Sequence, residues 1–252
     1  MPQLMRTSNP ALNDQAFRGE RLALGEEMMT VQGTVNKTGI LLLCAVATAA
    51  WTWNIFVHTH TPEAVAPMAL IGVFGGLILA LVTIFKKTWS PVTAPMYALC
   101  EGLALGSFSA ILELRFPGIA IEAVSLTFGT LVCLLLAYRS GIIRVTDKFR
   151  LGVVAATGGI MLFYLLEMVL SFFHVHFMAV NGSGAIGIGF SVFVVIIASL
   201  NLVLNFDFIE NGARAGAPKY MEWYGAFGLL VTLVWLYLEI LQLLAKLRSR
   251  ES

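Results

Sequence analysis

The sequence predicts an all-α integral membrane protein, a bundle of seven transmembrane helices. Of its 252 residues, 58% are hydrophobic and only 12% are charged. A water-soluble domain of this composition would lack the polar surface to cover its core, whereas a bundle in lipid needs little. The hydrophobic residues gather in seven runs, and every lysine and arginine is expected in a loop, in a tail or at the edge of a run.

Each apolar run is long enough to cross about 30 Å of hydrocarbon as a helix of about 20 residues. In chain order, the predicted spans are 38–57, 66–85, 92–113, 119–138, 151–173, 186–206 and 224–245. The connections are too short to bury a core of their own. We therefore expect one membrane domain over 38–247, between a polar N-terminal tail, 1–37, and a short C-terminal tail, 248–252.

The N-terminal tail does not lead from a basic region straight into a short apolar one, so it is not predicted to be a signal peptide. Basic residues are concentrated on one side of the predicted bundle, namely Arg6, Arg18, Arg21, Lys37, Lys86, Lys87, Arg139, Arg144, Lys148, Arg150, Arg214 and Lys219. The opposite loops contain Arg115. The positive-inside rule then predicts a cytoplasmic N-terminus, and seven crossings put the C-terminus outside.

The basic residues near the C-terminus favour a cytoplasmic C-terminus instead. Lys246, Arg248 and Arg250 are typical of an inside end, so a re-entrant seventh segment with six full spans is the alternative. The seventh run nevertheless has the length of a span, and it is bracketed by Trp223 and Tyr224 at interface depth. We therefore favour seven spans.

Small residues indicate how the helices pack. Gly72 and Gly76 in the second span, and Gly102 and Gly106 in the third, are spaced so that neighbouring backbones can approach closely. The fifth span contains three glycines that are expected to act in the same way, Gly152, Gly158 and Gly159.

Acidic residues inside the spans are the best candidates for a functional site. Glu101, Glu167 and Glu239 lie well inside spans, and Glu122 and Asp207 lie near span ends. No basic residue is predicted beside them, and an unpaired carboxylate in hydrocarbon must take up a proton or bind a cation. Their different depths predict a cation path through the bundle along Glu101, Glu167 and Glu122. The alternative is that each glutamate is protonated and hydrogen-bonded as a structural contact.

Helical spacing places further polar residues beside these acids. One face of the last span contains Thr232, Glu239, Gln242 and Lys246, and one face of the fifth contains Tyr164, Glu167, Ser171 and His174. If the two faces meet at one height, they line a narrow acidic interior.

Asp207 stands where the sixth apolar run stops. The following "ENGARAGAP" is typical of a helix end and loop. Asp207 and Glu222 would then both lie at the inner mouth and could share a proton. The alternative is that Asp207 is a solvated charge at the membrane edge.

Two stretches, "LNFDFIENG" and "LYLEILQLLAKL", together with the order of seven spans, resemble the Bax inhibitor-1/YccA-like family, also called the transmembrane Bax inhibitor motif family, in a bacterial branch. The resemblance covers about residues 30–247. It implies six helices around a central seventh, and a pH-sensitive calcium leak controlled by two aspartates on the last two helices.

In this resemblance, the first aspartate matches Asp207 and the second matches Glu239, which is a glutamate here. Glu222 is the physical alternative as the partner of Asp207. The family also uses an arginine in the second helix, and "APMALIGVFGGLILALVTIF" contains none.

Two functions are therefore carried forward. The first is a pH-sensitive leak in a bacterial inner membrane, with calcium as the permeant ion, Asp207 and Glu239 as its transient ligands, and no bound cofactor. The second is a membrane regulator that binds other membrane proteins, such as a modulator of cell death or of a membrane-bound ATP-dependent protease.

Other classes of function are disfavoured. The 16 basic and 15 acidic residues form no dominant basic face, so nucleic acid is not expected as a partner. An enzyme is not expected either, because the sequence has neither HExxH nor a serine in a nucleophile elbow. The four histidines form two HxH pairs in outer loops without an obvious third metal ligand, His58 with His60 and His174 with His176.

Overall fold

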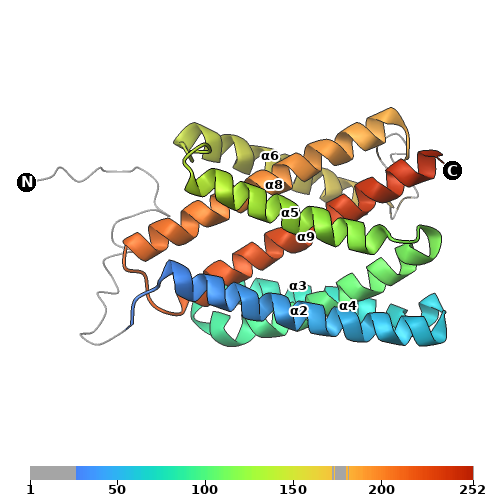
Figure 1. The fold of residues 1–252 in the computed structure, drawn as a ribbon, viewed down its shortest axis with the longest axis horizontal. Helices are drawn as coiled ribbons and strands as arrows, with labels where there is room; N and C mark the ends of the chain where they lie inside the picture. Colours follow the sequence, from blue (N-terminus) through green and yellow to red (C-terminus); the bar gives the residue numbers. More distant parts are fainter. Residues whose placement is uncertain (1–26, 172, 174–179, 181, 252) are drawn as a thin grey trace, which may run out of the picture.

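The computed structural model describes residues 27–171, 173, 180 and 182–251, and within them the chain forms seven long helices (Figure 1). Each is long and apolar enough to cross a membrane. The helices are α2 (Val31–Thr59), α3 (Pro62–Phe85), α4 (Ser90–Arg115), α5 (Ile119–Arg139), α6 (Asp147–Ser171), α8 (Ala185–Arg214) and α9 (Met221–Glu251), with a short 3₁₀ helix, η2 (Lys87–Trp89), before α4. The predicted all-α, seven-span class is confirmed.

Most helices extend beyond their predicted spans. Helix α2 begins at Val31 because the hydroxyl of Thr30 accepts a hydrogen bond from the backbone N–H of Gly33, which caps the first turn. Helix α8 continues beyond the predicted span 186–206 to Arg214, so it ends inside the stretch "ENGARAGAP", as that stretch predicted. An ion pair between Glu210 and Arg214, one turn apart, supports the extra turns.

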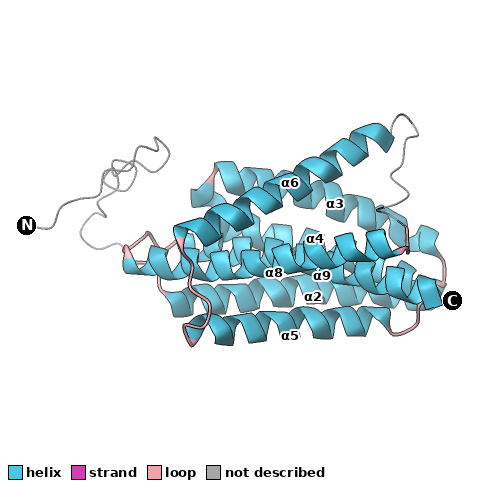
Figure 2. Ribbon diagram, turned by 90° about the horizontal axis from the view of Figure 1, so that it is seen from above, coloured by secondary structure: helices cyan, strands magenta, loops and turns pink. Residues whose placement is uncertain are grey.

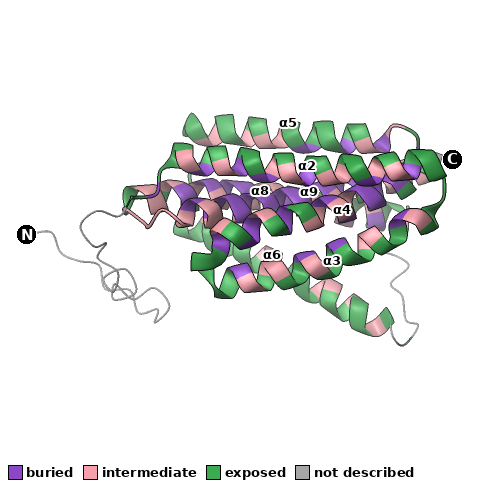
Figure 3. Cartoon of the chain, turned by 90° about the horizontal axis from the view of Figure 1, so that it is seen from below, coloured by how far each residue is buried: buried purple, intermediate pink, exposed green. Residues whose placement is uncertain are grey.

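The last helix is central. Buried residues occur on all sides of α9, which packs against α2, α4, α5 and α8 (Figure 3). Of the seven spans, α9 is the most buried within the bundle. The prediction of a central seventh helix is therefore confirmed.

Glycines bring α2, α3 and α4 close together. A Cβ atom at Gly72 of α3 would lie 2.6 Å from the backbone nitrogen of Ala104 in α4, and one at Gly106 of α4 would lie 2.6 Å from the backbone oxygen of Ala49 in α2. Side chains at these positions would force the helices apart, as the spacing predicted. The expectation for α6 is wrong, because no neighbouring atom lies within 4 Å of a Cβ placed at Gly152, Gly158 or Gly159.

Helix α6 is the least buried of the described spans. Only Val153 and Ile160 of its residues are buried, and it packs chiefly against α8. Figure 2 shows α6 inclined away from the other helices, so that its C-terminal end stands clear of the bundle. A helix held by so little apolar contact depends strongly on its polar contacts.

The two ends of the bundle differ in charge. We call the end where α2 and α9 begin the basic end, and the opposite end, at the α4–α5 connection, the far end (Figure 1). Among the described residues, the basic end has Lys37, Lys86, Lys87, Arg139, Arg144, Lys148, Arg150, Arg214 and Lys219, and the far end has Arg115, Lys246, Arg248 and Arg250.

Candidate functional site

Asp207 lies on α8 near the basic end and forms an ion pair with Arg150 in the first turn of α6. The nearest oxygen and nitrogen atoms are 2.7 Å apart, and the side chains are 17% and 52% exposed, respectively. The expectation that the acids have no basic partner is therefore wrong for Asp207. Asp207 is therefore not simply a solvated charge at the membrane edge, because its ion pair joins α6 to α8.

Further from the basic end, two amide side chains join α8 to its neighbours. Asn201 donates a hydrogen bond to the hydroxyl of Thr157 on α6, at 2.7 Å. Asn205 donates to the hydroxyl of Thr232 on α9, also at 2.7 Å, and to the backbone oxygen of Gly228. Because the two asparagines point to different helices, α8 is linked to both α6 and α9.

Glu239 lies deeper in the bundle and is 5% exposed. Its Oε1 accepts hydrogen bonds from the hydroxyl of Tyr164 on α6, at 2.8 Å, and from the indole N–H of Trp235, at 3.1 Å. Its Oε2 is buried and has no hydrogen-bond partner among the residues that the structure describes. A buried polar atom without a partner is costly, so this oxygen is poised to take up a proton or a cation.

These contacts join the same three helices at several heights, and we call their residues the α6–α8–α9 polar interface. It consists of Arg150, Thr157 and Tyr164 on α6, Asn201, Asn205 and Asp207 on α8, and Thr232, Trp235 and Glu239 on α9. The polar faces of the fifth and last spans meet at Tyr164 and Glu239.

Asp207 and Glu239 do not share a contact. Their partners on α6, Arg150 and Tyr164, are separated by roughly 20 Å along the helix at 1.5 Å per residue. The two acids therefore occupy different heights of the same interface.

Glu222 belongs to a separate site at the basic end. Its carboxylate is fully buried and accepts hydrogen bonds from the backbone N–H and the hydroxyl of Thr30, at 2.8 and 2.9 Å. It also forms an ion pair with Lys37 of α2, and Lys219 lies 3.4 Å away. We call Thr30, Lys37, Lys219 and Glu222 the Glu222 cluster. It joins the start of α2 to the start of α9, whereas Asp207 contacts α6.

Lys219 precedes α9 and contacts two carboxylates. Glu27 first, and then Glu222, raise the pKa of its ammonium group above the ordinary value of lysine. Lys219 therefore keeps its positive charge within the Glu222 cluster.

Lys246 corrects the expectation that all basic residues lie in loops, in tails or at span edges. Its side chain is buried against α8, where the ammonium group donates to the hydroxyl of Ser191, at 2.9 Å, and to the backbone oxygens of Val180 and Gly187. It also interacts electrostatically with Glu239 and Glu167. A positive charge therefore lies in the bundle interior toward the far end.

The three acids of the predicted cation path lie in different surroundings. Glu101 on α4 interacts with Tyr97 of its own helix, and Glu122 on α5 forms a 2.6 Å ion pair with Arg248 at the far end. Of these three acids, Glu167 on α6 interacts electrostatically with Tyr164 of the polar interface and with the neighbouring Lys246. The structure thus does not bring Glu101, Glu122 and Glu167 together.

No group of three or more His, Cys, Asp or Glu side chains within the described residues is arranged to hold a metal ion. Asp207 and Glu239 therefore do not share one metal site of this kind. His58 lies in the last turn of α2 and His60 ends that helix, whereas His174 and His176 lie outside the described residues.

Sequence reasoning missed the basic partners, Arg150, Lys37 and Lys246. For Arg150, a signal was present, since this arginine and Asp207 were both predicted at the same end of the bundle. Helix depth alone does not give the direction of a side chain, so the pairing became visible only with α6 placed beside α8.

Together, fold and site define a seven-helix membrane protein whose central last helix carries buried carboxylates. The chain belongs to the family described as Bax inhibitor 1 like, whose sequence model matches residues 9–249. No curated protein and no solved structure gives a significant match.

Proposed function

We propose that this protein is a pH-sensitive cation leak of a bacterial inner membrane, with Ca²⁺ as the permeant ion and the α6–α8–α9 polar interface as its control element. The observation that carries this proposal is Glu239, a buried carboxylate that joins α6 to α9 and has one oxygen without a partner in the described part of the chain. Such a group changes its contacts when it gains a proton or a cation.

Helix α6 is the element that these contacts hold in place. Its apolar support is a small cluster of Ile160 with Val194 and Ile197 of α8, together with ring contacts of Phe163 and Tyr164 on Phe190 of α8. Arg150, Thr157 and Tyr164 add three polar contacts. Weakening the two contacts that involve carboxylates would therefore let α6 move relative to α8 and α9.

Acidification weakens the contacts of Asp207 and Glu239, because it removes the negative charge of each carboxylate. At neutral pH an ionised Asp207 attracts Arg150, and protonation of Asp207 removes that attraction. A partly exposed ion pair contributes about 0–1 kcal/mol, and a hydrogen bond to a charged group contributes about 1.5–3 kcal/mol. Loss of both would shift the position of α6 by about tenfold or more in population, so flux is expected to rise as the pH falls.

The interface offers suitable ligands to calcium. Ca²⁺ is a hard cation that binds carboxylate, amide and hydroxyl oxygens. The interface presents these oxygens on Asp207, Asn205, Thr232 and Glu239. Lys246 lies beyond Glu239 toward the far end and opposes the passage of cations, which suits a slow leak rather than an open pore.

The test is calcium flux into liposomes that contain the purified protein, measured from pH 5 to 8. Asp207→Asn imitates the protonated acid, so its flux at pH 7 should rise by up to about fivefold toward the acidic value of the wild type. The double exchange Arg150→Asp with Asp207→Arg should restore low flux at neutral pH, because it rebuilds the ion pair in reverse. Glu239→Gln keeps an acceptor for Tyr164 but removes the charge, so it imitates the protonated acid and should also raise flux at pH 7.

Asp147→Asn is the matched control. Asp147 is an exposed acid in the first turn of α6 and forms no ion pair within the described residues, so its replacement should leave flux unchanged. Wild-type flux equal to that of empty liposomes at every pH would contradict the leak. If flux were unchanged in Asp207→Asn, in the Arg150→Asp and Asp207→Arg double variant and in Glu239→Gln, the assigned interface would be contradicted.

A further inference from the structure

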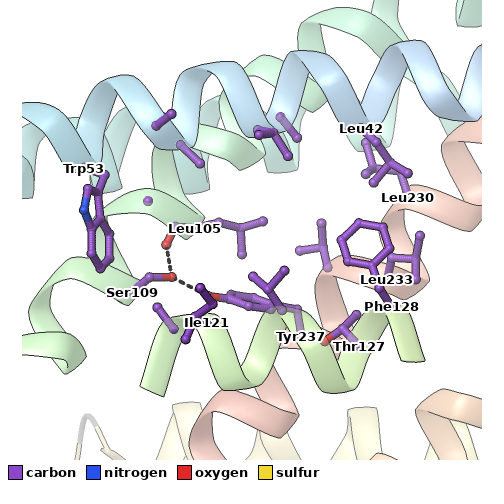
Figure 4. Close-up of a pocket in the computed structure, with 18 of the residues that line it drawn as sticks. Leu42, Trp53, Leu105, Ser109, Ile121, Thr127, Phe128, Leu230, Leu233 and Tyr237 are labelled. Atoms are coloured by element: carbon purple, nitrogen blue, oxygen red, sulfur yellow. Dashed lines mark hydrogen bonds between the residues drawn. The ribbon is translucent and has the colours of Figure 1, made fainter. Parts of the chain in front are cut away.

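A large apolar cavity lies on the side of α9 opposite the polar interface. Its volume is about 640 Å³, within the range of about 300–1,000 Å³ that is common for ligand sites. Four helices line it, and Figure 4 shows Trp53 of α2 at one end, Leu42 and Leu230 at the other, and Tyr237 of α9 along its wall.

The cavity opens sideways toward the lipid. Several residues that line it are also exposed on the outer surface, including Val46 of α2, at 56%, and Ile121 of α5, at 72%. Helix α5 packs against α9, α8 and α4, and the cavity separates it from α2. Since both helices span the membrane, the medium at this opening is the acyl-chain region of the bilayer.

Most polar groups of the cavity are already satisfied by the protein. The hydroxyls of Ser109 and Tyr237 bond to each other, at 2.6 Å, and Thr127 donates to the backbone of its own helix, at 2.7 Å. Glu113 accepts from the backbone N–H groups of Gly118 and Ala120. With so few free polar groups in the lining, water or a polar ligand would lose hydrogen bonds by entering, so the cavity suits an apolar occupant.

The length and position of the cavity indicate which occupant. Along α2 it runs from Leu42 to Trp53, about 16 Å at 1.5 Å per residue, which is about half of the 30 Å hydrocarbon core. Glu113 in the last turns of α4 and Ala120 in the first turn of α5 line it, so it reaches the far end. One leaflet supplies acyl chains of this length and orientation.

We propose that this cavity binds one acyl chain of a membrane phospholipid from the leaflet at the far end. The chain enters between α2 and α5 and reaches Leu233 and Tyr237, which are 4% and 8% exposed on the central helix. The bilayer thereby contacts the one helix that the other elements surround. This proposal stands apart from the proposed leak, because it rests on the opposite side of α9.

The test is photolabelling of the full-length protein in vesicles of phosphatidylethanolamine and phosphatidylglycerol. The vesicles contain a phosphatidylglycerol with a diazirine in the middle of one acyl chain, and labelled residues are mapped by mass spectrometry. Adducts are expected on the α9 residues Leu230, Leu233 and Tyr237, as well as on outward-facing residues. Adducts on outward-facing residues alone would overturn the proposal, as would a cross-linked dimer with α9 attached to a second copy of the chain.

A pair of matched variants checks the route of entry. Val124 of α5 lines the opening and is 42% exposed, whereas Val132 lies two turns further along the same helix, is 53% exposed and does not line the cavity. Val124→Phe should reduce labelling of α9 about tenfold by filling the opening, and Val132→Phe should leave it unchanged. Both substitutions lie on the lipid-facing surface, where folding tolerates them. Equal labelling of α9 in the two variants would contradict entry between α2 and α5.

Discussion

Single residues of the Glu222 cluster show how a charge can be buried in this bundle. The Glu222 carboxylate has no exposed surface, yet both of its oxygens have partners on Thr30 and Lys37. Loss of a partner from a buried ion pair costs about 3–5 kcal/mol, because the remaining charge is left without compensation. The cluster therefore makes a large contribution to the docking of α2 on α9.

Gly33 is the residue at which this contribution can be tested without removing a charge. A Cβ atom at Gly33 would overlap the carboxylate of Glu222, whereas no neighbouring atom lies within 4 Å of a Cβ at Gly39 on the same helix. Gly33→Ala should lower the free energy of unfolding by about 2 kcal/mol or more, because it displaces the carboxylate from its partners. Gly39→Ala should be neutral or stabilising by up to about 1 kcal/mol, because alanine favours helix.

The measurement is the apparent Tm of each variant in detergent, followed by intrinsic fluorescence. A Gly33→Ala variant as stable as Gly39→Ala would show that the cluster adjusts at little cost.

At the scale of elements, α6 differs from the other helices. It has two buried residues and is attached to α8 and α9 by side chains at three heights. An element with few buried apolar contacts opens at a lower free energy than one embedded in the core. This is the physical reason for placing the moving part of the proposed leak at α6.

Cross-linking tests whether α6 moves. Cysteines at Thr157 and Asn201, whose polar atoms are 2.7 Å apart, can be joined by a short bifunctional thiol reagent after Cys44, Cys100 and Cys133 are replaced by serine. We expect the joined protein to lose the rise in flux at acidic pH. The matched control joins Thr83 to Thr93, whose hydroxyls are also 2.7 Å apart but link α3 to α4, and should leave the rise intact. Equal loss in both proteins would argue against a specific movement of α6.

At the scale of the whole molecule, the two ends differ in how their basic residues are used. At the far end, Arg248 is paired with Glu122 and Lys246 is buried against α8. These contacts reduce the free positive charge that would hold the C-terminus in the cytoplasm. The structure thus offers a physical reason why the last span can cross fully despite its basic tail.

Orientation can be measured by labelling intact cells with a membrane-impermeant maleimide. On the cysteine-free background, Arg250→Cys at the far end should be labelled in intact cells, and Arg144→Cys at the basic end only after lysis. The reverse pattern would contradict a cytoplasmic N-terminus. Labelling of both positions only after lysis would favour the re-entrant alternative.

Much of the fold could be predicted because lipid imposes strong local rules. Each span must satisfy its own backbone hydrogen bonds, so length and hydropathy alone located seven helices. The close packing at the glycine pairs that begin at Gly72 and Gly102 could also be predicted, since a helix without side chains at this spacing lets the backbone of a neighbouring helix approach closely. Helix ends were less predictable, because α8 extends past Asp207 through contacts such as the Glu210–Arg214 pair.

Candidate site residues could be named from sequence, but their contacts could not. A carboxylate in an apolar run is costly wherever the helix lies, so Asp207, Glu222 and Glu239 stood out by residue type and depth. Whether each acid meets a proton, a cation or a basic side chain depends on which faces of which helices come together. That arrangement pairs Asp207 with Arg150 and Glu222 with Lys37, and separates Asp207 from Glu239.

The sequence by itself therefore determined that the chain is a seven-helix membrane bundle with acids in its interior, because composition and hydropathy are properties of each segment alone. Only the tertiary structure decided that α6 has few buried residues, that Lys246 is buried and that an apolar cavity separates α2 from α5. These features depend on the rotation and tilt of each helix about its own axis, and the hydrophobic pattern of a lipid-facing helix constrains these only weakly.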